Sequence, residues 1–370
     1  MKEYAFTFGD TASKVFIQHE LPSLNDILEG IGEKNTLLVC DENTAHIAEK
    51  IAENTTTPLC ILPPGEISKN WTSIERILKA GKDAGLARDG LFVGIGGGVI
   101  SDMVSFAASV YMRGTKVRLV STSLLGMVDA ALGGKTGIDL FDVKNFVGTF
   151  YPADRIFVPI AALESLPERE WKSGMAEIIK TAVLDTNTQE NQEEESFLSL
   201  ISSLSSCFNN PSLLLKEKSE QINECITRSL LIKGRIVEAD PKETGETRVL
   251  LNLGHTFAHA LESSAGLGQI SHGEAVAWGM ARECELGFAL GITPLKRKEH
   301  ILNLLRDFGY EITSPHPLMK NAEDFMDLMK SDKKKKAGKL VFVIPAEKGA
   351  CLLSEEKTDA QLLMRIIKGA

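Results

Sequence analysis

Histidines with a spacing suited to metal binding lie in residues 252–274, which read Asn-Leu-Gly-His-Thr-Phe-Ala-His-Ala-Leu-Glu and, after a glycine-containing break, Ser-His-Gly-Glu. This stretch holds three of the seven histidines in the chain. His255 and His259 are four residues apart in a segment compatible with a helix, so both imidazoles would share one face. Gly266 would end that helix, and His272 follows on the next segment. Because imidazole is a common ligand of zinc, we predict a metal site; the alternative is a pair of partly buried helix histidines.

An acidic residue that would complete this ligand set lies earlier in the chain. Glu177 and Lys180 are three residues apart in a predicted helix, so their side chains would project together. With the histidines, Glu177 would form a mixed oxygen and nitrogen ligand set that suits zinc and leaves positions open for a substrate. The alternative is an ordinary ion pair within the helix.

A glycine-rich turn offers a second kind of chemistry. Residues 91–95 are predicted as a strand, residues 96–98 are three glycines, and residues 99–111 are predicted as an apolar helix that carries Asp102. Glycines in such a turn let backbone N–H groups approach a pyrophosphate at the helix N-terminus. The dinucleotide fingerprint G-x-G-x-x-G is not satisfied, so the alternative is a tight turn with a structural role only.

Another glycine-rich segment, Gly-Gly-Lys-Thr-Gly at residues 133–137, resembles the end of a phosphate-binding P-loop. A complete P-loop needs a glycine where this chain has Asp129, so an ATPase is disfavoured. Lys135 in a glycine-rich turn would still suit an anionic oxygen of a ligand. The alternative is a hairpin with a surface lysine.

The elements that must position these residues are a parallel sheet followed by helices. Residues 36–40, 58–62 and 91–95 are short apolar runs that alternate with helical segments up to about residue 160, which favours a parallel sheet with crossover helices. In such sheets ligands bind at the carboxyl ends of the strands. Farther along, apolar residues recur at helical spacing. We therefore predict an α/β domain over residues 1–170 and a helical domain over residues 171–370.

Two segments have an unusual composition. Residues 187–210 are acidic and then rich in serine and asparagine, which predicts a surface excursion. Residues 333–336 are four lysines, which indicate a solvated turn before a strand at residues 340–344. The alternative for the lysine run is that one of its side chains enters an anion site.

Length, charge and cysteine content limit the classes of protein. At 370 residues the chain exceeds the usual size of one hydrophobic core, which favours two domains. A net charge of -9 argues against a nucleic-acid partner, and no run approaches the ~20 apolar residues of a membrane span. The N-terminus lacks the apolar core of a secretion signal, and the six cysteines form no C-x-x-C pair. We expect a cytoplasmic protein that acts on a small molecule.

In combination, these motifs resemble the 3-dehydroquinate synthases, a family of sugar phosphate cyclases. The resemblance covers residues 36–345 and is most specific over residues 94–280. The matching sequences are Gly-Gly-Gly-Val-Ile-Ser-Asp at 96–102, Tyr-Met-Arg-Gly at 111–114, Asp129 with Gly-Gly-Lys-Thr-Gly at 133–137, Lys-Asn at 144–145, Leu-Pro-Glu-Arg-Glu at 166–170, Ala-Glu-Ile-Ile-Lys at 176–180, Asn-Leu-Gly-His-Thr-Phe at 252–257 and His-Gly-Glu-Ala at 272–275. The resemblance implies an α/β NAD-binding domain with a Rossmann-like parallel sheet, followed by an all-α metal-binding domain, in a homodimer.

The resemblance also implies roles for individual residues. A zinc or cobalt ion would be held by Glu177, His255 and His272, which moves His259 from the metal ligands to the substrate contacts. Catalytic or substrate contacts would come from Lys135, Lys180, Lys233, Arg248, Asn252, His259, Asn145, Asp129 and Arg113, the last of these from the partner subunit. NAD would contact Asp41, Asn43, Glu66, Lys69, Gly97, Gly98, Val99, Asp102, Thr122, Ser123 and Lys144.

The implied reaction converts 3-deoxy-D-arabino-heptulosonate 7-phosphate to 3-dehydroquinate and phosphate, a step of the shikimate pathway. It would proceed by a transient oxidation with NAD, phosphate elimination, reduction, ring opening and an intramolecular aldol closure. This sequence departs from the family pattern at Asp139, Val143 and residues 181–182, which bears on substrate detail.

Two alternative functions share parts of this pattern. Other sugar phosphate cyclases act on different sugar phosphates, but Asn252, His259 and Lys233 match the dehydroquinate branch. A metal-dependent polyol dehydrogenase of the same broad fold would share the glycine turn and the histidines. It would have no need of several lysines and arginines around one site.

Overall fold

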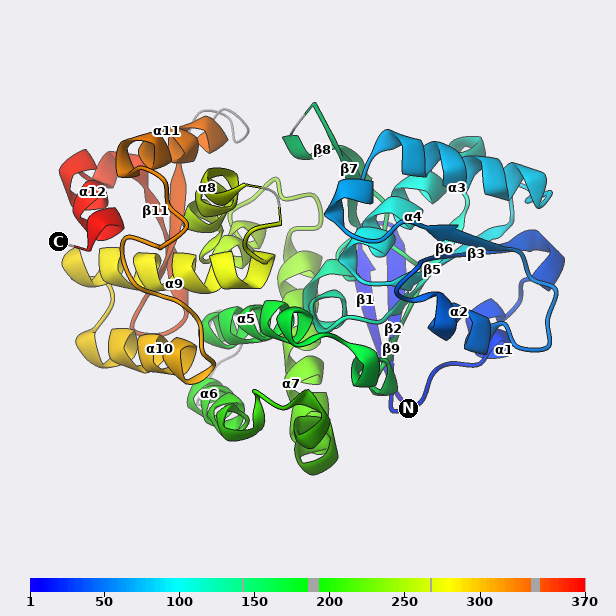
Figure 1. The fold of residues 1–370 in the computed structure, drawn as a ribbon, viewed down its shortest axis with the longest axis horizontal. Coiled ribbons are helices and arrows are strands. Elements are labelled where there is room, and N and C mark those ends of the chain that lie inside the picture. Colours follow the sequence, from blue (N-terminus) through cyan, green and yellow to red (C-terminus); the bar gives the residue numbers. More distant parts are fainter. Residues whose placement is uncertain (142, 186–192, 267, 334–339, 370) are drawn as a thin grey trace. The chain divides into compact units, whose positions relative to one another are not determined.

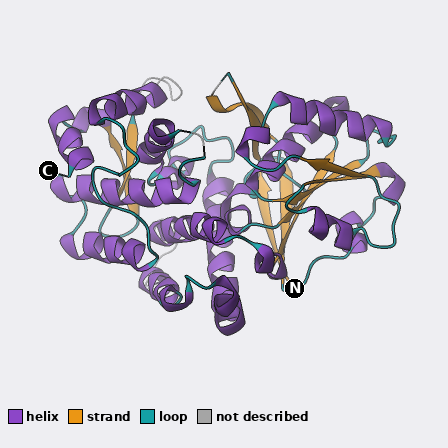
Figure 2. Cartoon of the chain, in the orientation of Figure 1, coloured by secondary structure: helices purple, strands orange, loops and turns teal. Residues whose placement is uncertain are grey.

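A computed structural model describes residues 1–141, 143–185, 193–266, 268–333 and 340–369. The chain forms two compact units, Met1–Pro167 and Glu168–Ala370. Figure 1 labels their elements, and Figure 2 shows that strands dominate the interior of the first unit and helices the second. No helix in the described part of the chain is long and apolar enough to cross a membrane.

The first unit is built on a twisted sheet of seven strands in the order β1-β2-β9-β6-β5-β3-β4. All neighbouring pairs in it are parallel except β1 and β2. The strands are β1 (Lys2–Phe8), β2 (Thr11–Gln18), β3 (Thr36–Asp41), β4 (Leu59–Leu62), β5 (Leu91–Gly96), β6 (Lys116–Ser121) and β9 (Arg155–Pro159). The predictions of a parallel sheet and of the strands at 36–40, 58–62 and 91–95 are confirmed.

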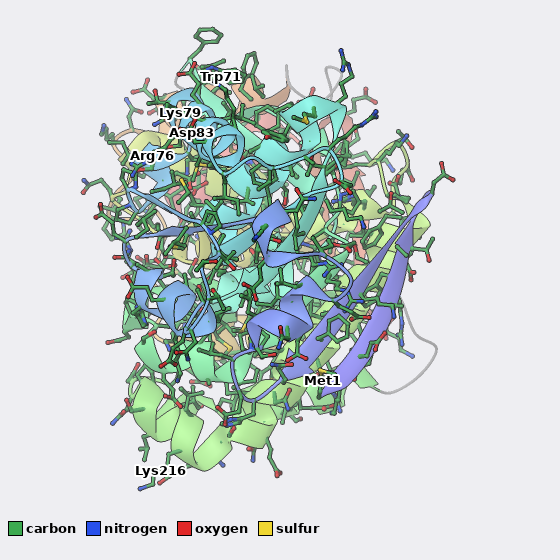
Figure 3. All side chains as sticks on the ribbon, turned by 90° about the vertical axis from the view of Figure 1, so that its right-hand side faces the viewer. Met1, Trp71, Arg76, Lys79, Asp83 and Lys216 are labelled. Carbon is green, nitrogen blue, oxygen red and sulfur yellow. The ribbon has the colours of Figure 1, made fainter. Side chains whose placement is uncertain are left out.

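Helices cover the faces of this sheet: α1 (Leu24–Leu28), α2 (Ala45–Ile51), α3 (Trp71–Asp83) and α4 (Gly98–Val110). Every residue of β5 is buried, as expected for a central strand with helices on both faces. The outer face of α3 is polar, and Figure 3 shows Lys79 and Asp83 on it, where their side chains form an ion pair of 2.6 Å. Trp71 at the start of this helix is 44% exposed.

Close packing explains the glycines between β5 and α4. A Cβ atom at Gly96 would lie 2.7 Å from the side chain of Ile100, and a Cβ atom at Gly97 would lie 2.9 Å from Oγ of Ser123. Larger residues would therefore push α4 away from the end of β5. A separate antiparallel hairpin, β7 (Lys135–Leu140) and β8 (Val143–Phe150), packs on α4.

The second unit is mainly helical. Its helices are α5 (Glu168–Leu184), α6 (Glu193–Ser202), α7 (Pro211–Ala239), α8 (His255–Ala265), α9 (His272–Ala289), α10 (Leu295–Asp307), α11 (Ala322–Lys333) and α12 (Ala360–Lys368). The α9 helix packs against α5, α8, α10 and α12, and Trp278 lies in its buried core. The predicted helical domain is confirmed, but this unit also contains a two-stranded sheet, β10 (Val341–Pro345) with β11 (Ala350–Ser354).

Of the two polar segments predicted at the surface, the first is partly buried. The surface excursion predicted at 187–210 is wrong for residues 197–208, because α6 buries Phe197 and Ile201, and Phe208 packs edge-to-face on Phe308. Residues 186–192 lie outside the described part of the chain. The α11 helix ends at Lys333. The other three lysines of the predicted turn, residues 334–336, also lie outside the described part of the chain.

Candidate metal and cofactor sites

Three residues of the second unit form a group that could hold a metal ion. Among the described residues, Glu177, His255 and His272 each offer a ligand atom, and these atoms all lie within 4.8 Å of one another. Oε1 of Glu177 is 3.6 Å from Nε2 of His272 and 3.9 Å from Nε2 of His255. One carboxylate oxygen and two imidazole nitrogens are a ligand set that suits zinc or cobalt. The residues therefore fit a divalent transition-metal ion.

Three helices position this trio. Glu177 lies within α5 and is fully buried, whereas His255 is the first residue of α8 and His272 the first residue of α9. Ser271 caps α9 by accepting a hydrogen bond from the backbone N–H of Glu274. Both α5 and α8 pack on α9, which brings together residues up to 95 positions apart in the chain.

The two histidines differ in their surroundings. Nδ1 of His255 lies 3.1 Å from the carbonyl oxygen of Leu253. Burial, aided by the positive charge of Lys180, holds the pKa of His255 well below its usual value, so this ring is neutral. Burial opposes protonation of His272 as well, but the carboxylates of Glu177 and Glu262 beside its ring outweigh the effect of burial and raise the pKa of His272 to about 10. Metal binding at His272 must therefore displace a proton.

Close helix contacts at glycine hold the metal trio in place. A Cβ atom at Gly279 of α9 would lie 2.0 Å from the carbonyl oxygen of Gly254, the residue before His255. Gly254 itself has a left-handed backbone, with φ +83°. Its N–H donates to the carboxylate of Glu283, which is fully buried and also accepts a 3.4 Å hydrogen bond from the N–H of Val343. The start of α8 is thereby fixed against α9 and β10.

His259 lies beside this trio, as the predicted helical spacing requires. Its ring centroid is 5.6 Å from that of His255. It is not one of the three residues whose ligand atoms converge. The two histidines that share one helix face, His255 and His259, are therefore not the ligand pair. The pair is His255 on α8 and His272 on α9.

Further predicted site residues of this unit lie on elements that pack together. Lys180, Lys233 and Arg248 are buried, on α5, on α7 and at the start of the short helix η8 (Arg248–Asn252). Both α5 and α7 pack against η8. Nζ of Lys180 contacts the carboxylate of Glu177. Nδ2 of Asn252, at the end of η8, donates to Oε1 of Glu243 at 3.4 Å.

In the first unit, the predicted cofactor residues line the edge of the sheet that is formed by the carboxyl ends of its strands. They follow the carboxyl ends of β6, β5, β3 and β4, which are neighbours in that order. Ligands of parallel α/β sheets bind at this edge, and the N-terminus of α4 there supplies backbone N–H groups. The residues are Thr122 and Ser123 after β6, Gly97, Gly98, Val99 and Asp102 after β5, Asp41 and Asn43 at β3, and Glu66 and Lys69 after β4.

A polar cluster joins this edge to the β7–β8 hairpin. Nζ of Lys69 is 2.6 Å from Oδ2 of Asp102 and 2.6 Å from Oδ1 of Asn145 on the hairpin. The backbone N–H of Asn145, which has φ +52°, donates to Oδ1 of Asp139 at 2.8 Å. Burial opposes the charge on Lys69, but Asp102 and Glu66 raise its pKa above the usual value. Asp139, where the sequence departs from the family pattern, therefore supports the backbone of Asn145.

The remaining predicted residues of the first unit lie around the hairpin and the end of α4. Asp129 is in the π-helical turn η4 (Gly126–Ala130), Lys135 begins β7 and Lys144 is on β8. Arg113 ends the turn η3 (Tyr111–Arg113), is exposed, and has φ +70°.

Sequence reasoning missed Glu262, Glu283 and the tightly packed glycines of α9. Glu262 follows His255 and His259 at the spacing i, i+4, i+7, which places all three on one helix face, so its sequence position was an available signal. Glu283 had no such signal, because its partners come from a different helix start and from a strand.

The fold is similar to that of two solved enzymes whose structures contain NAD+ and a divalent metal ion. A 2-epi-5-epi-valiolone synthase from Streptomyces hygroscopicus, solved with NAD+ and Zn2+ bound, superposes with a TM-score of 0.83 at 23% identity, covering 99% of this chain and 96% of that one. A 2-deoxy-scyllo-inosose synthase complexed with carbaglucose-6-phosphate, NAD+ and Co2+ gives a TM-score of 0.82 at 22% identity, with 100% of both chains covered. At these identities the likeness concerns the fold.

The sequence comparisons identify the family. The family models described as 3-dehydroquinate synthase N-terminal and C-terminal match residues 59–173 and 174–335. A 3-dehydroquinate synthase from Dictyoglomus turgidum is 38% identical over 309 residues, which are 83% of this chain and 81% of that protein. The chain belongs to the 3-dehydroquinate synthase family, which confirms the resemblance found in the motifs. The prediction of an enzyme of this family is likewise confirmed.

Proposed function

We propose that this protein converts 3-deoxy-D-arabino-heptulosonate 7-phosphate to 3-dehydroquinate and phosphate. Family membership supports the reaction, and the convergence of Glu177, His255 and His272 is the single structural observation that carries it. The second unit then serves as the domain that binds metal and substrate, and the first as the NAD-binding domain. The domain boundaries that the sequence predicts, residues 1–170 and 171–370, are part of this proposal.

The metal trio would hold zinc or cobalt with positions left for substrate hydroxyl groups. A divalent ion there supplies Lewis-acid stabilisation of developing negative charge, worth several kcal/mol. Glu177 brings a negative charge into a buried place, and Lys180 beside it balances that charge when no ion is bound. His259, on the same helix face as His255, is placed to contact the substrate.

NAD would lie at the sheet edge that carries Gly97, Gly98 and Asp102. Bound there, it supplies a hydride acceptor that is regenerated in each turnover. The N-terminus of α4 favours its pyrophosphate, and the buried ammonium of Lys69 orients Asp102 and Asn145 toward one another. Lys69 thus belongs to the cofactor site and also positions a substrate contact.

Cationic side chains would hold the two anionic groups of the substrate, its phosphate and its carboxylate. In the second unit these are Lys180, Lys233 and Arg248, which are all buried. Side chains held in place by packing lose little entropy when they bind an anion, which suits them to orient the substrate. Asn252 beside Arg248 offers a neutral hydrogen-bonding group in the same region.

The test is an assay of phosphate release from the heptulosonate phosphate with NAD present in a trace amount. We expect many turnovers per NAD and no build-up of NADH. His272→Ala should abolish turnover together with metal binding, whereas His46→Ala, at an exposed histidine of α2, should leave both unchanged. If oxidation of the substrate instead stops at one equivalent of the added NAD, with NADH formed and no phosphate released, the protein is a polyol dehydrogenase.

We further propose a homodimer in which Arg113 completes the active site of the partner. Two consecutive residues other than glycine, Met112 and Arg113, have left-handed backbones, with φ +48° and +70°. Such strain costs roughly 1–3 kcal/mol per residue and tends to occur at functional positions. The same unit exposes the apolar side chains of Val110, Met112 and Phe150. The segments that carry Val110 and Phe150 are in contact, because the hydroxyl of Thr149 donates a 2.9 Å hydrogen bond to Oγ of Ser109. An exposed apolar patch is typical of an interface.

Subunit complementation tests this dimer. Arg113→Ala and Lys135→Ala proteins, each inactive alone, are mixed and allowed to exchange subunits. If Arg113 acts on the partner's site, each heterodimer has one intact site and therefore about half the activity of a wild-type dimer, while the homodimers in the mixture stay inactive. Heterodimers that form but stay inactive would place Arg113 in its own chain's site or outside any site.

A cytoplasmic location is also part of the proposal. All six cysteines lie in described segments and are free thiols, and Cys40, Cys60, Cys225 and Cys284 are buried. Reduced thiols are the usual state in a cytoplasm. Cell fractionation with an antibody to the protein tests this location.

A further inference from the structure

His272 has a different carboxylate at each of its two ring nitrogens. Nε2 lies 3.6 Å from Oε1 of Glu177, within the metal trio, and Nδ1 lies 3.6 Å from Oε1 of Glu262. A histidine that binds a metal through Nε2 keeps its proton on Nδ1, and that N–H needs an acceptor. Glu262 is the carboxylate on that side of the ring.

We propose that Glu262 is a positioning residue of the metal site: it accepts the Nδ1–H of His272 and so fixes the tautomer and the orientation of this ring. The inference rests on the proposed metal site and assigns it a further member. The side chain of Glu262 is 9% exposed, so its carboxylate is largely removed from water. Its place on α8 shares a face with His255, the other histidine of the trio.

The two histidines of the trio are therefore held by acceptors of different kinds. Nδ1 of His255 faces a neutral backbone carbonyl, that of Leu253, at 3.1 Å. Nδ1 of His272 faces a carboxylate, which draws its proton more strongly and makes the opposite nitrogen a better electron donor. The α8 helix thus supplies one ligand itself and the acceptor that orients the ligand at the start of α9. A change at Glu262 should act on His272 alone.

The alternative is that Glu262 forms an ordinary ion pair that contributes to folding and not to metal binding. Three variants separate the two. Glu262→Ala removes the acceptor, and Glu262→Gln keeps an acceptor oxygen without the charge. Glu224→Gln is the matched control, because Oε1 of Glu224 accepts from Nε of Arg228 at 2.8 Å on α7, apart from the metal trio.

The experiment measures zinc affinity by competition with a chromophoric chelator, the visible spectrum of the cobalt-loaded protein, and thermal unfolding of the metal-free protein. We expect Glu262→Ala to weaken zinc binding by about 10- to 100-fold and to alter the cobalt spectrum. Glu262→Gln should lose less affinity than the alanine variant, and Glu224→Gln should match the wild type. The glutamine variant also keeps the test valid if the alanine variant fails to fold.

Two results would overturn the inference, and they are distinguishable. In the first, the wild-type protein binds zinc, and Glu262→Gln and Glu262→Ala bind it as tightly as the wild type, with unchanged cobalt spectra. Glu262 then has a structural role only, and the metal site stands. If the wild-type protein itself binds neither zinc nor cobalt, the proposed metal site is wrong, and the role of Glu262 is wrong with it.

Discussion

A single methyl group added at Gly279 should separate the two metal-binding helices. The Cβ atom of Gly279→Ala would lie 2.0 Å from the carbonyl oxygen of Gly254, whereas ordinary contacts of a Cβ atom begin at 3.4 Å. The start of α8 must therefore move by about 3.4 − 2.0 = 1.4 Å, or α9 must yield by the same amount. The clashing atom belongs to the backbone, so no side-chain rotation relieves it.

This displacement is large on the scale of a metal site. Ligand positions must be kept to within about 0.5 Å of the productive geometry, and His255 is the residue that follows Gly254. Overpacking of this kind costs about 1–3 kcal/mol of folding free energy, while alanine in a helix interior returns up to about 1 kcal/mol. We expect a net loss of about 2 kcal/mol, because the backbone contact places the cost toward the upper end.

Two measurements test this reasoning. Zinc affinity of Gly279→Ala should fall by at least tenfold, and the metal-free variant should unfold at a lower temperature than the wild type, by about 4–8 °C for a unit of this size. Gly32→Ala is the control, because a Cβ atom there meets nothing within 4 Å. A Gly279→Ala protein with wild-type zinc affinity and unfolding temperature would refute the view that this contact sets the ligand geometry.

Three further predictions concern the same region. Because the pKa of His272 is raised from 6.5 to about 10, the folded metal-free protein keeps a proton that the unfolded chain releases between these pH values. Its free energy of unfolding, measured with urea, should therefore fall between about pH 6.5 and pH 10. The His272→Ala variant should lose this pH dependence. His255→Ala should bind little metal, whereas His259→Ala should keep its metal content and lose turnover. Loss of metal from His259→Ala would show that His259 is a metal ligand. Glu283→Ala leaves the N–H of Gly254 buried without its acceptor, which costs about 1–3 kcal/mol of stability in denaturant titrations, and an unchanged midpoint would contradict this role.

The fold could be predicted where local pattern reflects burial. Apolar runs bounded by polar residues located β3, β4 and β5 to within about a residue of their ends, because these strands are buried and short. The pairing of β2 with β9 could not be predicted, since it joins residues about 140 positions apart and depends on how the sheet closes. In α6 the apolar residues Phe197 and Ile201 recur at helical spacing, but the many polar residues around them are typical of a surface segment.

In the candidate site too, features set by local spacing could be predicted, and those set by packing between helices could not. Spacing placed His255 and His259 on one helix face, and this was right, but it also suggested that both bind the metal. The structure selects His255 with His272 because α8 and α9 meet at their first residues, a relation that no spacing within one helix expresses. The contact of Glu283 with Gly254 likewise depends on packing between helices.

The position of both histidines at the first residue of a helix has an electrostatic consequence. Peptide dipoles leave the N-terminus of a helix with about half a positive charge, so α8 and α9 both direct positive potential toward the place where His255 and His272 meet. That potential disfavours a cation and favours an anion. The buried carboxylates of Glu177 and Glu262 offset it for a divalent ion, while an anionic oxygen of a substrate would gain from the helix termini themselves. The same peptide groups that make the metal harder to hold would thus strengthen the binding of the ligand that the metal receives.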